Sequence, residues 1–203
     1  MRHNFATLLL LTALLPLSLF AQPFEGTLHI RTDDAKLMYH MRDANVRLDI
    51  PGDEGLVSIL LNRDSQKMVL LIDSEKLTME LAFPADEINE EMNDSDLADY
   101  TKTGRKKTIA GVECEEWRNP NRSRLWTPVT NRFGALFTPN APGMSDVFAD
   151  FPGAHFFPFE VTDEDGKLVW QVTQVNARTL PETLFQVPEG WGKFNFNFNF
   201  GNK

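Results

Sequence analysis

Apolar and polar residues alternate along much of the chain from residue 24 onward. In residues 24–31, Phe24, Leu28 and Ile30 fall on one side, with Gly26 between them, and polar residues fall on the other. Successive side chains of a strand point to opposite faces, so this pattern predicts a half-buried strand. The same alternation recurs at three more sets of apolar positions: Leu37, Tyr39 and Met41; Val46, Leu48 and Ile50; Leu77, Met79 and Leu81.

Two denser apolar runs, residues 57–61 and 68–72, predict central strands that are covered on both sides. Short polar segments at residues 33–34, 51–53, 62–65 and 73–75 form four of the five connections between the six predicted strands. These segments are rich in the Asp, Asn, Ser, Gly and Pro residues that form turns. Consecutive strands joined by short turns favour a mainly antiparallel meander over a βαβ fold.

Pro84 interrupts this pattern, and the acidic residues 86–99 with their sparse apolar positions predict one amphipathic helix. Strands return at residues 112–118 and 125–127, at Phe157, Phe159 and Val161, and at residues 167–176. A loop at residues 128–158, with a short helix near residues 145–150, separates them. The Asp-Gly pair in residues 163–166 predicts a hairpin turn, because Gly adopts the positive φ that such a turn requires.

The amino terminus predicts a secretory signal. A basic start, an apolar run over residues 5–20 and the small Ala21 follow one another in the order of a cleavable signal peptide. We expect cleavage after Ala21 and export to the periplasm or a similar envelope space. Residues 22–192 then form a single β domain, and residues 193–203 form a tail of alternating Phe and Asn that is either an ordered strand or a disordered end.

Charge and apolar length limit the partners of the mature protein. No segment after the signal is long and apolar enough to span a bilayer, so the mature chain is not expected to be an integral membrane protein. The formal net charge of −9 argues against nucleic acid as a partner, because phosphate binding needs clustered Lys and Arg. The one basic cluster, residues 105–107, predicts a hydrated turn between Gly104 and Gly111.

The sequence predicts no catalytic centre, no metal site and no cofactor. If residues 33–34 close a hairpin, His29 and His40 become diagonal neighbours on its polar face, but no third ligand is predicted beside them. Cys114 is the sole cysteine and has glutamates on both sides, whose charge raises a thiol pKa and lowers its reactivity. No nucleophile elbow and no glycine-rich phosphate loop occur, so an enzyme ranks last among the function classes.

The remaining candidate for a functional feature is the large number of apolar side chains on the predicted sheet. A curved antiparallel sheet that its own side chains do not fill leaves room for an apolar guest on its concave side. The residues expected to line such a site are Leu28, Ile30, Leu48, Ile59, Leu61, Leu70, Trp117, Trp126, Phe157, Phe159 and Trp170.

Two segments resemble a family of uncharacterised exported bacterial proteins, classed as a domain of unknown function. Residues 103–117, TGRKKTIAGVECEEW, match its Thr-Gly, Ile-x-Gly-x-x-Cys and aromatic pattern, and residues 184–191, LFQVPEGW, match its closing Phe-x-x-Pro-x-Gly-aromatic signature. A similar ending occurs in relatives of the periplasmic lipoprotein carriers LolA and LolB. The resemblance implies a half-open, incomplete barrel with one or two covering helices and an apolar inner face. It implies no catalytic residue. Beside the resemblance, the residues themselves predict that Pro188 to Gly190 end the last regular strand and that Trp191 caps the core.

Two functions follow as expectations. The first is a non-catalytic periplasmic protein that binds an acyl chain, a lipid or a lipoprotein in the concave face of its sheet. The second is a structural or interaction protein of the cell envelope, which contacts a partner protein through the acidic helix and the Phe-Asn tail.

Overall fold

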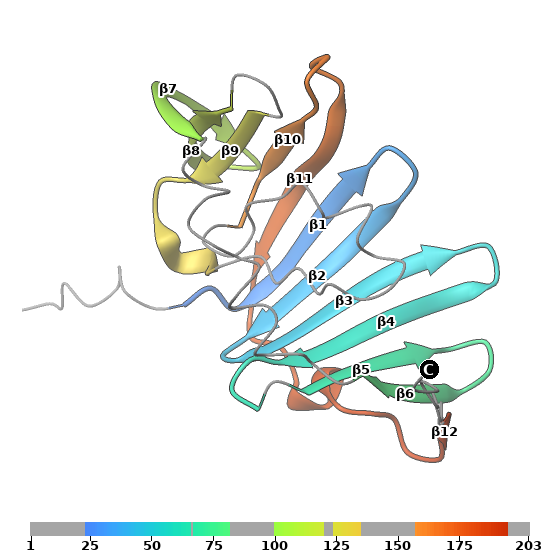
Figure 1. The fold of residues 1–203 in the computed structure, drawn as a ribbon. Coiled ribbons are helices and arrows are strands. Elements are labelled where there is room, and N and C mark those ends of the chain that lie inside the picture. Colours follow the sequence, from blue (N-terminus) through green and yellow to red (C-terminus); the bar gives the residue numbers. More distant parts are fainter. Residues whose placement is uncertain (1–22, 66, 82–99, 120–123, 135–156, 195–203) are drawn as a thin grey trace, which may run out of the picture.

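The computed structural model in Figure 1 describes residues 23–65, 67–81, 100–119, 124–134 and 157–194. Their strands form one 12-stranded sheet in the order β12-β6-β5-β4-β3-β2-β1-β11-β10-β9-β8-β7. The strands are β1 (Gly26–Thr32), β2 (Lys36–Arg42), β3 (Asn45–Gly52), β4 (Gly55–Asn62), β5 (Lys67–Ile72), β6 (Leu77–Leu81), β7 (Thr101–Ile109), β8 (Val112–Arg118), β9 (Arg124–Pro128), β10 (Glu160–Thr162), β11 (Leu168–Ala177) and β12 (Gly192–Lys193).

The predicted antiparallel meander is confirmed in β1 to β6. Each of these strands pairs with the next in antiparallel register. Because directly opposed residues point to the same face, the register aligns one row of apolar side chains across the sheet. From β11 to β6 this row contains Val175, Leu28, Tyr39, Leu48, Ile59, Leu70 and Met79.

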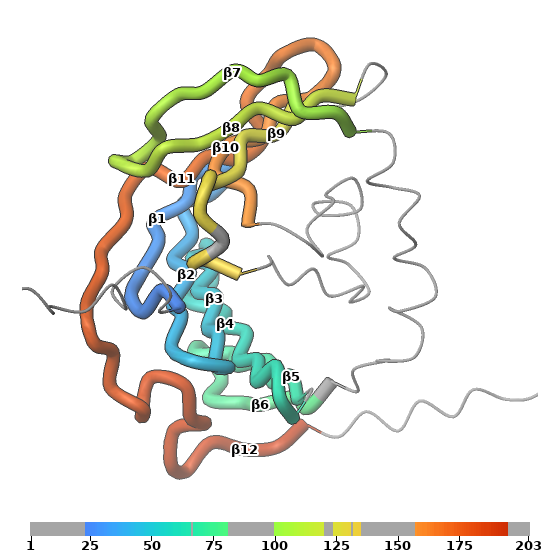
Figure 2. The backbone as a smooth tube through the Cα atoms, turned by 90° about the vertical axis from the view of Figure 1, so that its left-hand side faces the viewer, coloured from blue at the N-terminus to red at the C-terminus, as the bar shows by residue number. Residues whose placement is uncertain are grey.

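The sheet is open and curved, and Figure 2 shows its strands following an arc from β7 to β6. The face that carries the apolar row, called the inner face below, lies on the concave side of this arc. The short 3₁₀ helix η2 (Asn131–Phe133) lies against it. The opposite face, called the outer face, carries the polar residues of β1 to β4. One hydrophobic cluster spans the inner face from Met68 of β5 to Leu125 of β9.

Strands β7 and β8 correct one prediction from the sequence. The basic residues 105–107 do not form a hydrated turn, because they lie inside β7. Glutamates of the neighbouring strands explain the difference. Lys106 pairs with Glu113 at 3.3 Å, and Arg105 lies 3.4 Å from Glu116, so cross-strand charge pairs accommodate the basic cluster in the ladder.

The turn in this hairpin is formed by Ala110 and Gly111 instead, with φ angles of 48° and 82°. Two successive residues with positive φ are typical of a tight hairpin turn, for which glycine is favoured. A second correction concerns β10, which begins at Glu160, so Phe157 and Phe159 precede the strand that their alternation predicts.

The carboxy-terminal part of the described chain crosses the outer face. Residues 178–191, called the strap, contain the 3₁₀ helix η3 (Glu182–Phe185) and lead from β11 to β12, which pairs in parallel with β6. The segment from Pro188 to Gly190 therefore lies in a loop before β12 and does not end the last strand. Trp191 is half-buried and is not among the residues of the core cluster.

Several predicted segments lie outside the described residues. These are the signal peptide, the acidic helix at 86–99, the short helix near 145–150 and the Phe-Asn tail beyond residue 194. The helices that the structure does describe, η2 and η3, have three and four residues. Within the described ranges, no helix has the length and apolar character needed to cross a membrane.

Candidate functional site

Aromatic side chains gather on the inner face where η2 approaches β1 and β2. The ring of Phe133 lies 4.8 Å from that of Phe24 and 4.9 Å from that of Phe159. Phe157 makes an edge contact with Tyr39 at 5.0 Å. These ring separations lie in the range that aromatic pairs prefer, so the cluster fixes η2 and the start of β10 against the sheet.

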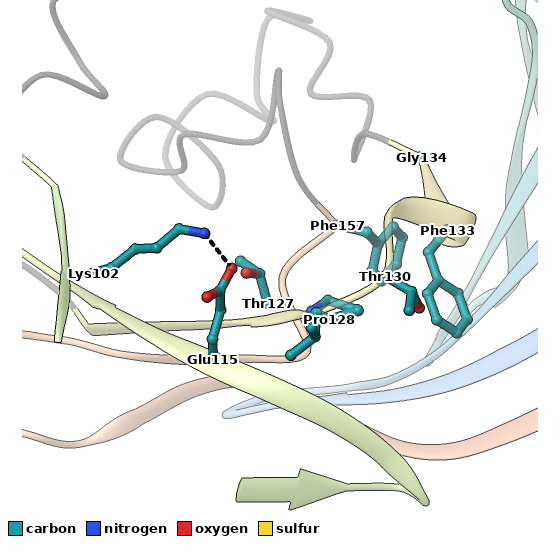
Figure 3. Close-up of a pocket in the computed structure, with 9 residues that line it drawn as sticks. Lys102, Glu115, Thr127, Pro128, Thr130, Phe133, Gly134 and Phe157 are labelled. Atoms are coloured by element: carbon teal, nitrogen blue, oxygen red, sulfur yellow. Dashed lines mark hydrogen bonds and ion pairs between the residues drawn. The ribbon is translucent and has the colours of Figure 1, made fainter. Parts of the chain in front are cut away.

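A pocket of about 210 Å³ opens beside this cluster. Its apolar end contains Phe133, Phe157 and Val129, and its polar end contains Lys102 and Glu115, as Figure 3 shows for the labelled residues. The lining residues come from β7, β8, β9, η2 and the segments next to them, and they also include Thr127, Pro128, Thr130 and Gly134. The volume lies below the range of about 300–1,000 Å³ that holds a drug-sized molecule, so the pocket suits one end of a longer ligand.

The polar end of the pocket is neutralised by its own residues. Lys102 Nζ donates a hydrogen bond to Glu115 Oε1 at 2.7 Å and lies 4.7 Å from the centre of the Trp117 ring. The Lys102 side chain is 53% exposed, so this ion pair contributes little stability. Trp117 Nε1 in turn donates to Thr127 Oγ1 at 3.0 Å. The Lys102 charge is therefore already matched before any ligand enters.

The structure places the predicted lining residues mainly in the packed core. Leu28 and Ile30 are 0% and 1% exposed. Phe157 is the member of the predicted set that also lines the pocket. Trp126 lies on the outer face, because its register partners Glu116 and Glu160 point there. The inner face carries the rest of the set: Leu28, Ile30, Leu48, Ile59, Leu61, Leu70, Trp117, Phe159 and Trp170.

Sequence reasoning did not find the polar lining of the pocket. Lys102 and Glu115 come from two strands that are paired across a register shift in β7, which no periodic pattern predicts. Phe133 lies in the region that the sequence assigns to a loop. Its apolar character between Arg132 and Gly134 was the available signal, since a loop side chain of this kind needs a surface to pack against.

A second constellation, on the outer face, connects polar side chains of β1 to β4. His40 Nδ1 lies 2.9 Å from Thr27 Oγ1, and His40 Nε2 lies 3.2 Å from Asp49 Oδ2. Ser58 Oγ and Arg47 Nε both donate to Asp49 Oδ1 at 2.6 Å. This outer-face network is buried, with Thr27 and Ser58 each 2% exposed.

The outer-face network also holds the strap in place. Arg47 Nη1 donates to the carbonyl oxygen of Leu184 at 3.0 Å, and Arg42 Nη1 donates to that of Leu180 at 3.0 Å. The Leu180 amide donates to Glu25 Oε1 at 2.8 Å. A substrate cannot reach the Thr27 hydroxyl in this arrangement, so the histidine and aspartate are suited to stabilising the sheet and the strap.

The pKa of Asp49 reflects this environment. Burial by itself raises the pKa of the carboxyl, but hydrogen bonds with His40, Ser58 and Arg47 and the Arg47 charge outweigh burial and lower the pKa from 3.8 to about 2. The carboxylate therefore stays ionised in the folded protein over the physiological pH range.

Cys114 is buried, with 0% exposure, and burial raises the pKa of its thiol to about 12 although the nearby Lys107 charge opposes this. A neutral thiol in such a place is a poor nucleophile and a poor metal ligand. Within the described part of the chain, no group of three or more His, Cys, Asp or Glu side chains is arranged to hold a metal ion.

Comparison with known proteins places the chain in a family. The model of the family described as "Domain of unknown function (DUF4412)" matches residues 24–191. Among solved structures, the chain resembles the crystal structure of an uncharacterized conserved protein from Thermus thermophilus, with 11% sequence identity and a TM-score of 0.47 over 86% of this chain and 90% of that chain. No curated protein matches the chain. Because the family match spans every strand from β1 to β11, the chain belongs to the DUF4412 family.

Proposed function

We propose that this protein is a non-catalytic binding protein of the periplasm or a similar envelope space. Its ligand is apolar or amphiphilic: an acyl chain, a lipid or the acyl part of a lipoprotein. The ligand places one end in the pocket beside η2, on the inner side of the sheet. We include in this proposal that the fold is of the half-open barrel type found in the lipoprotein carriers LolA and LolB.

The observation that carries the proposal is the pocket on the apolar side of an open sheet. Its lining includes Phe133 and Phe157, which are 2% and 1% exposed, together with Pro128, while Val129 on its rim is 41% exposed and offers the larger apolar surface. Covering such apolar surface stabilises a complex by about 25 cal/mol for each Å² removed from water. An alkyl chain gains from this contact, whereas a polar metabolite of the same size does not.

The test is a fluorescence titration with a fatty acid that carries an environment-sensitive fluorophore. The wild-type protein is expected to bind the probe, with an enhanced and saturable emission. Val129→Glu introduces a charge on the rim of the pocket and is expected to weaken binding by about tenfold or more, because a carboxylate must then be desolvated or displaced.

The chain offers a matched control at Val187. This residue is 43% exposed and lies on the strap, away from the inner face. Val187→Glu therefore makes the same chemical change at similar exposure and is expected to leave the affinity for the probe unchanged. Absence of saturable binding in the wild-type protein, or equal affinities of both variants and the wild type, would contradict the proposal.

A further inference from the structure

Arg63 lies in the turn between β4 and β5, and no described residue matches its charge. Its guanidinium reaches back over the inner face, where Nη2 contacts the Met41 sulfur at 4.0 Å. Its Nε is buried and has no hydrogen-bond partner within the described ranges. The ion pairs found among these residues do not include Arg63. Within the described part of the chain, a guanidinium is therefore held against apolar surface without an anion.

The guanidinium of Arg63 lies directly against the pocket wall at Gly134. A β-carbon added to Gly134 would lie 3.0 Å from Arg63 Nη1, and Gly134 also has a φ of 67°, which favours glycine. Arg63 is not itself a lining residue of the pocket, but it lies against one, because Gly134 lines the pocket next to Phe133.

Arg132 brings a second guanidinium to the same end. Its Cζ lies 5.0 Å from the centre of the Phe133 ring and 5.5 Å from that of Phe24. Arg132 is exposed and, like Arg63, has no carboxylate partner among the ion pairs of the described residues. Arg132 thus lies against Phe133, and Arg63 lies against the adjacent Gly134, in a protein whose formal net charge is −9.

An unmatched, partly buried charge is costly, since the guanidinium loses water contacts that none of the described residues replaces. A carboxylate or phosphate group supplies the missing partner best, because its oxygens accept two parallel hydrogen bonds from one guanidinium. The charge of Lys102 at the other end of the pocket is already matched by Glu115. An anion is therefore favoured near Gly134 and Phe133, where Arg63 and Arg132 lie, and not near Lys102.

We propose that Arg63, assisted by Arg132, binds the anionic head group of an amphiphile whose alkyl chain lies on the inner face. This inference rests on the proposed function and adds the class of ligand: a single-chain or lipid molecule with a carboxylate or phosphate head. Arg63 makes the direct contact to the head group, and Arg132 provides a second positive charge near Phe133.

Competition experiments test this directly. Dodecanoate, dodecyl phosphate and the uncharged dodecanol compete at pH 8 for the protein against an uncharged naphthylamine probe. Dodecanoate and dodecyl phosphate are expected to bind about tenfold or more tightly than dodecanol, as for a hydrogen bond to a charged group. Inorganic phosphate without an alkyl chain distinguishes a free anion from a lipid head group and is expected not to compete.

Arg63→Gln is expected to remove the preference for dodecanoate over dodecanol while leaving the affinity for dodecanol unchanged. Arg118→Gln is the matched control, because Arg118 is exposed and points to the outer face by its register with Arg124. This variant loses the same charge and is expected to keep the full preference.

The outcomes separate the inference from the proposed function. If dodecanoate and dodecanol bind the wild-type protein equally, or if inorganic phosphate competes as well as dodecyl phosphate, the inference is overturned. If no alkyl compound displaces the probe, the proposed function fails as well. The ratio measured on the wild-type protein decides the question even if Arg63→Gln does not fold.

Discussion

Asp49 connects three side chains of the outer face through its two carboxylate oxygens. It accepts hydrogen bonds from Arg47 and Ser58 and lies within hydrogen-bonding distance of His40, which in turn contacts Thr27. The same Arg47 reaches the carbonyl oxygen of Leu184 in the strap. One buried carboxylate therefore links the register of β1 to β4 with the position of the chain that covers them.

We predict that Asp49→Asn lowers the free energy of unfolding by about 3–5 kcal/mol, the usual effect of removing one partner from a buried ion pair. The Arg47 guanidinium then lies beside a neutral amide, and both Asp49 oxygen positions lose charge. Urea denaturation at pH 7 measures the change. A loss below about 1 kcal/mol would show that the outer-face network does not support the fold.

The pKa of Asp49 adds a dependence on pH. The folded-state value of about 2 lies below the ordinary value of 3.8, so the carboxylate contributes stability above pH 3.8 and loses it as the pH falls through about 2. The shift corresponds to about 2 kcal/mol. Between pH 5 and pH 2 the wild-type protein is therefore expected to lose about 2 kcal/mol more than Asp49→Asn, as measured by urea denaturation at each pH.

The sequence predicts which face such residues occupy but not their environment. Alternation correctly assigns His40 and Thr27 to the polar face of the first hairpin. Their burial depends on the strap, which returns from more than 130 positions away along the chain, as the contact between Arg42 and Leu180 shows. Trp126 illustrates a second limit. It follows Leu125 directly, so both faces of β9 carry a large apolar side chain and alternation does not define its side.

At the scale of elements, the strap is the clearest feature that periodicity does not predict. Residues 178–191 have no strand pattern, and their described backbone is held by hydrogen bonds to side chains of β2, β3 and the segment before β1. Leu180, a residue of the strap, is buried, with 1% exposure. The strap therefore has the contacts of a folded element, although its regular secondary structure is limited to one short 3₁₀ helix.

We predict that Leu180→Ala lowers the free energy of unfolding by about 2–5 kcal/mol, because it removes a buried side chain and leaves a cavity under the strap. Val187→Ala on the same strap is the control. Val187 is 43% exposed, so its change is expected to stay within about 0.5 kcal/mol. Chemical denaturation followed by tryptophan fluorescence measures both variants. Equal stabilities would mean that the strap does not fold together with the sheet.

Strands were the elements that the sequence predicted best. The six strands from β1 to β6 follow the expected positions because one face is buried throughout, which makes the period of two visible. The sequence does not predict strand β7, because most of its residues are exposed and four of the nine are basic. Strand β7 is held by its ladder with β8, and its lysines also pair with glutamates of β8 and β10, such as Glu160, which lies 2.6 Å from Lys107. An ion pair such as this one joins residues that are distant along the chain, so a local sequence pattern does not reveal it.

At the scale of the whole molecule, the order of the strands explains why the apolar inner face is continuous. The strands from β1 to β11 pair antiparallel, and β11 inserts between β1 and β10, so the amino-terminal meander and the β7–β10 half join into one sheet. Sequence alternation predicted a curved antiparallel sheet with a concave apolar side. It did not predict that β11 joins the two halves, because long-range pairing depends on contacts about 140 positions apart along the chain, such as that between Arg31 and Gln171.

The pocket follows from this joining of two halves. Phe133 and Phe157 bring loop residues to the inner face at the place where β9 and β10 meet β1 and β2 through the aromatic cluster. Arg63 from the β4–β5 turn reaches the same place. The candidate ligand site therefore draws on segments that no local motif connects, which is why the sequence predicted an apolar face but not the residues of the pocket.

The most direct measurement of the central claim is native mass spectrometry of the protein purified gently from an envelope fraction, followed by extraction of any bound molecule. The account predicts a fraction of the protein with an added mass that an organic solvent removes, and that the extract contains an acyl compound with an acidic head group. Protein that carries no added mass under these conditions, and that takes up no fatty acid when it is supplied, would contradict the claim that the inner face binds an apolar ligand.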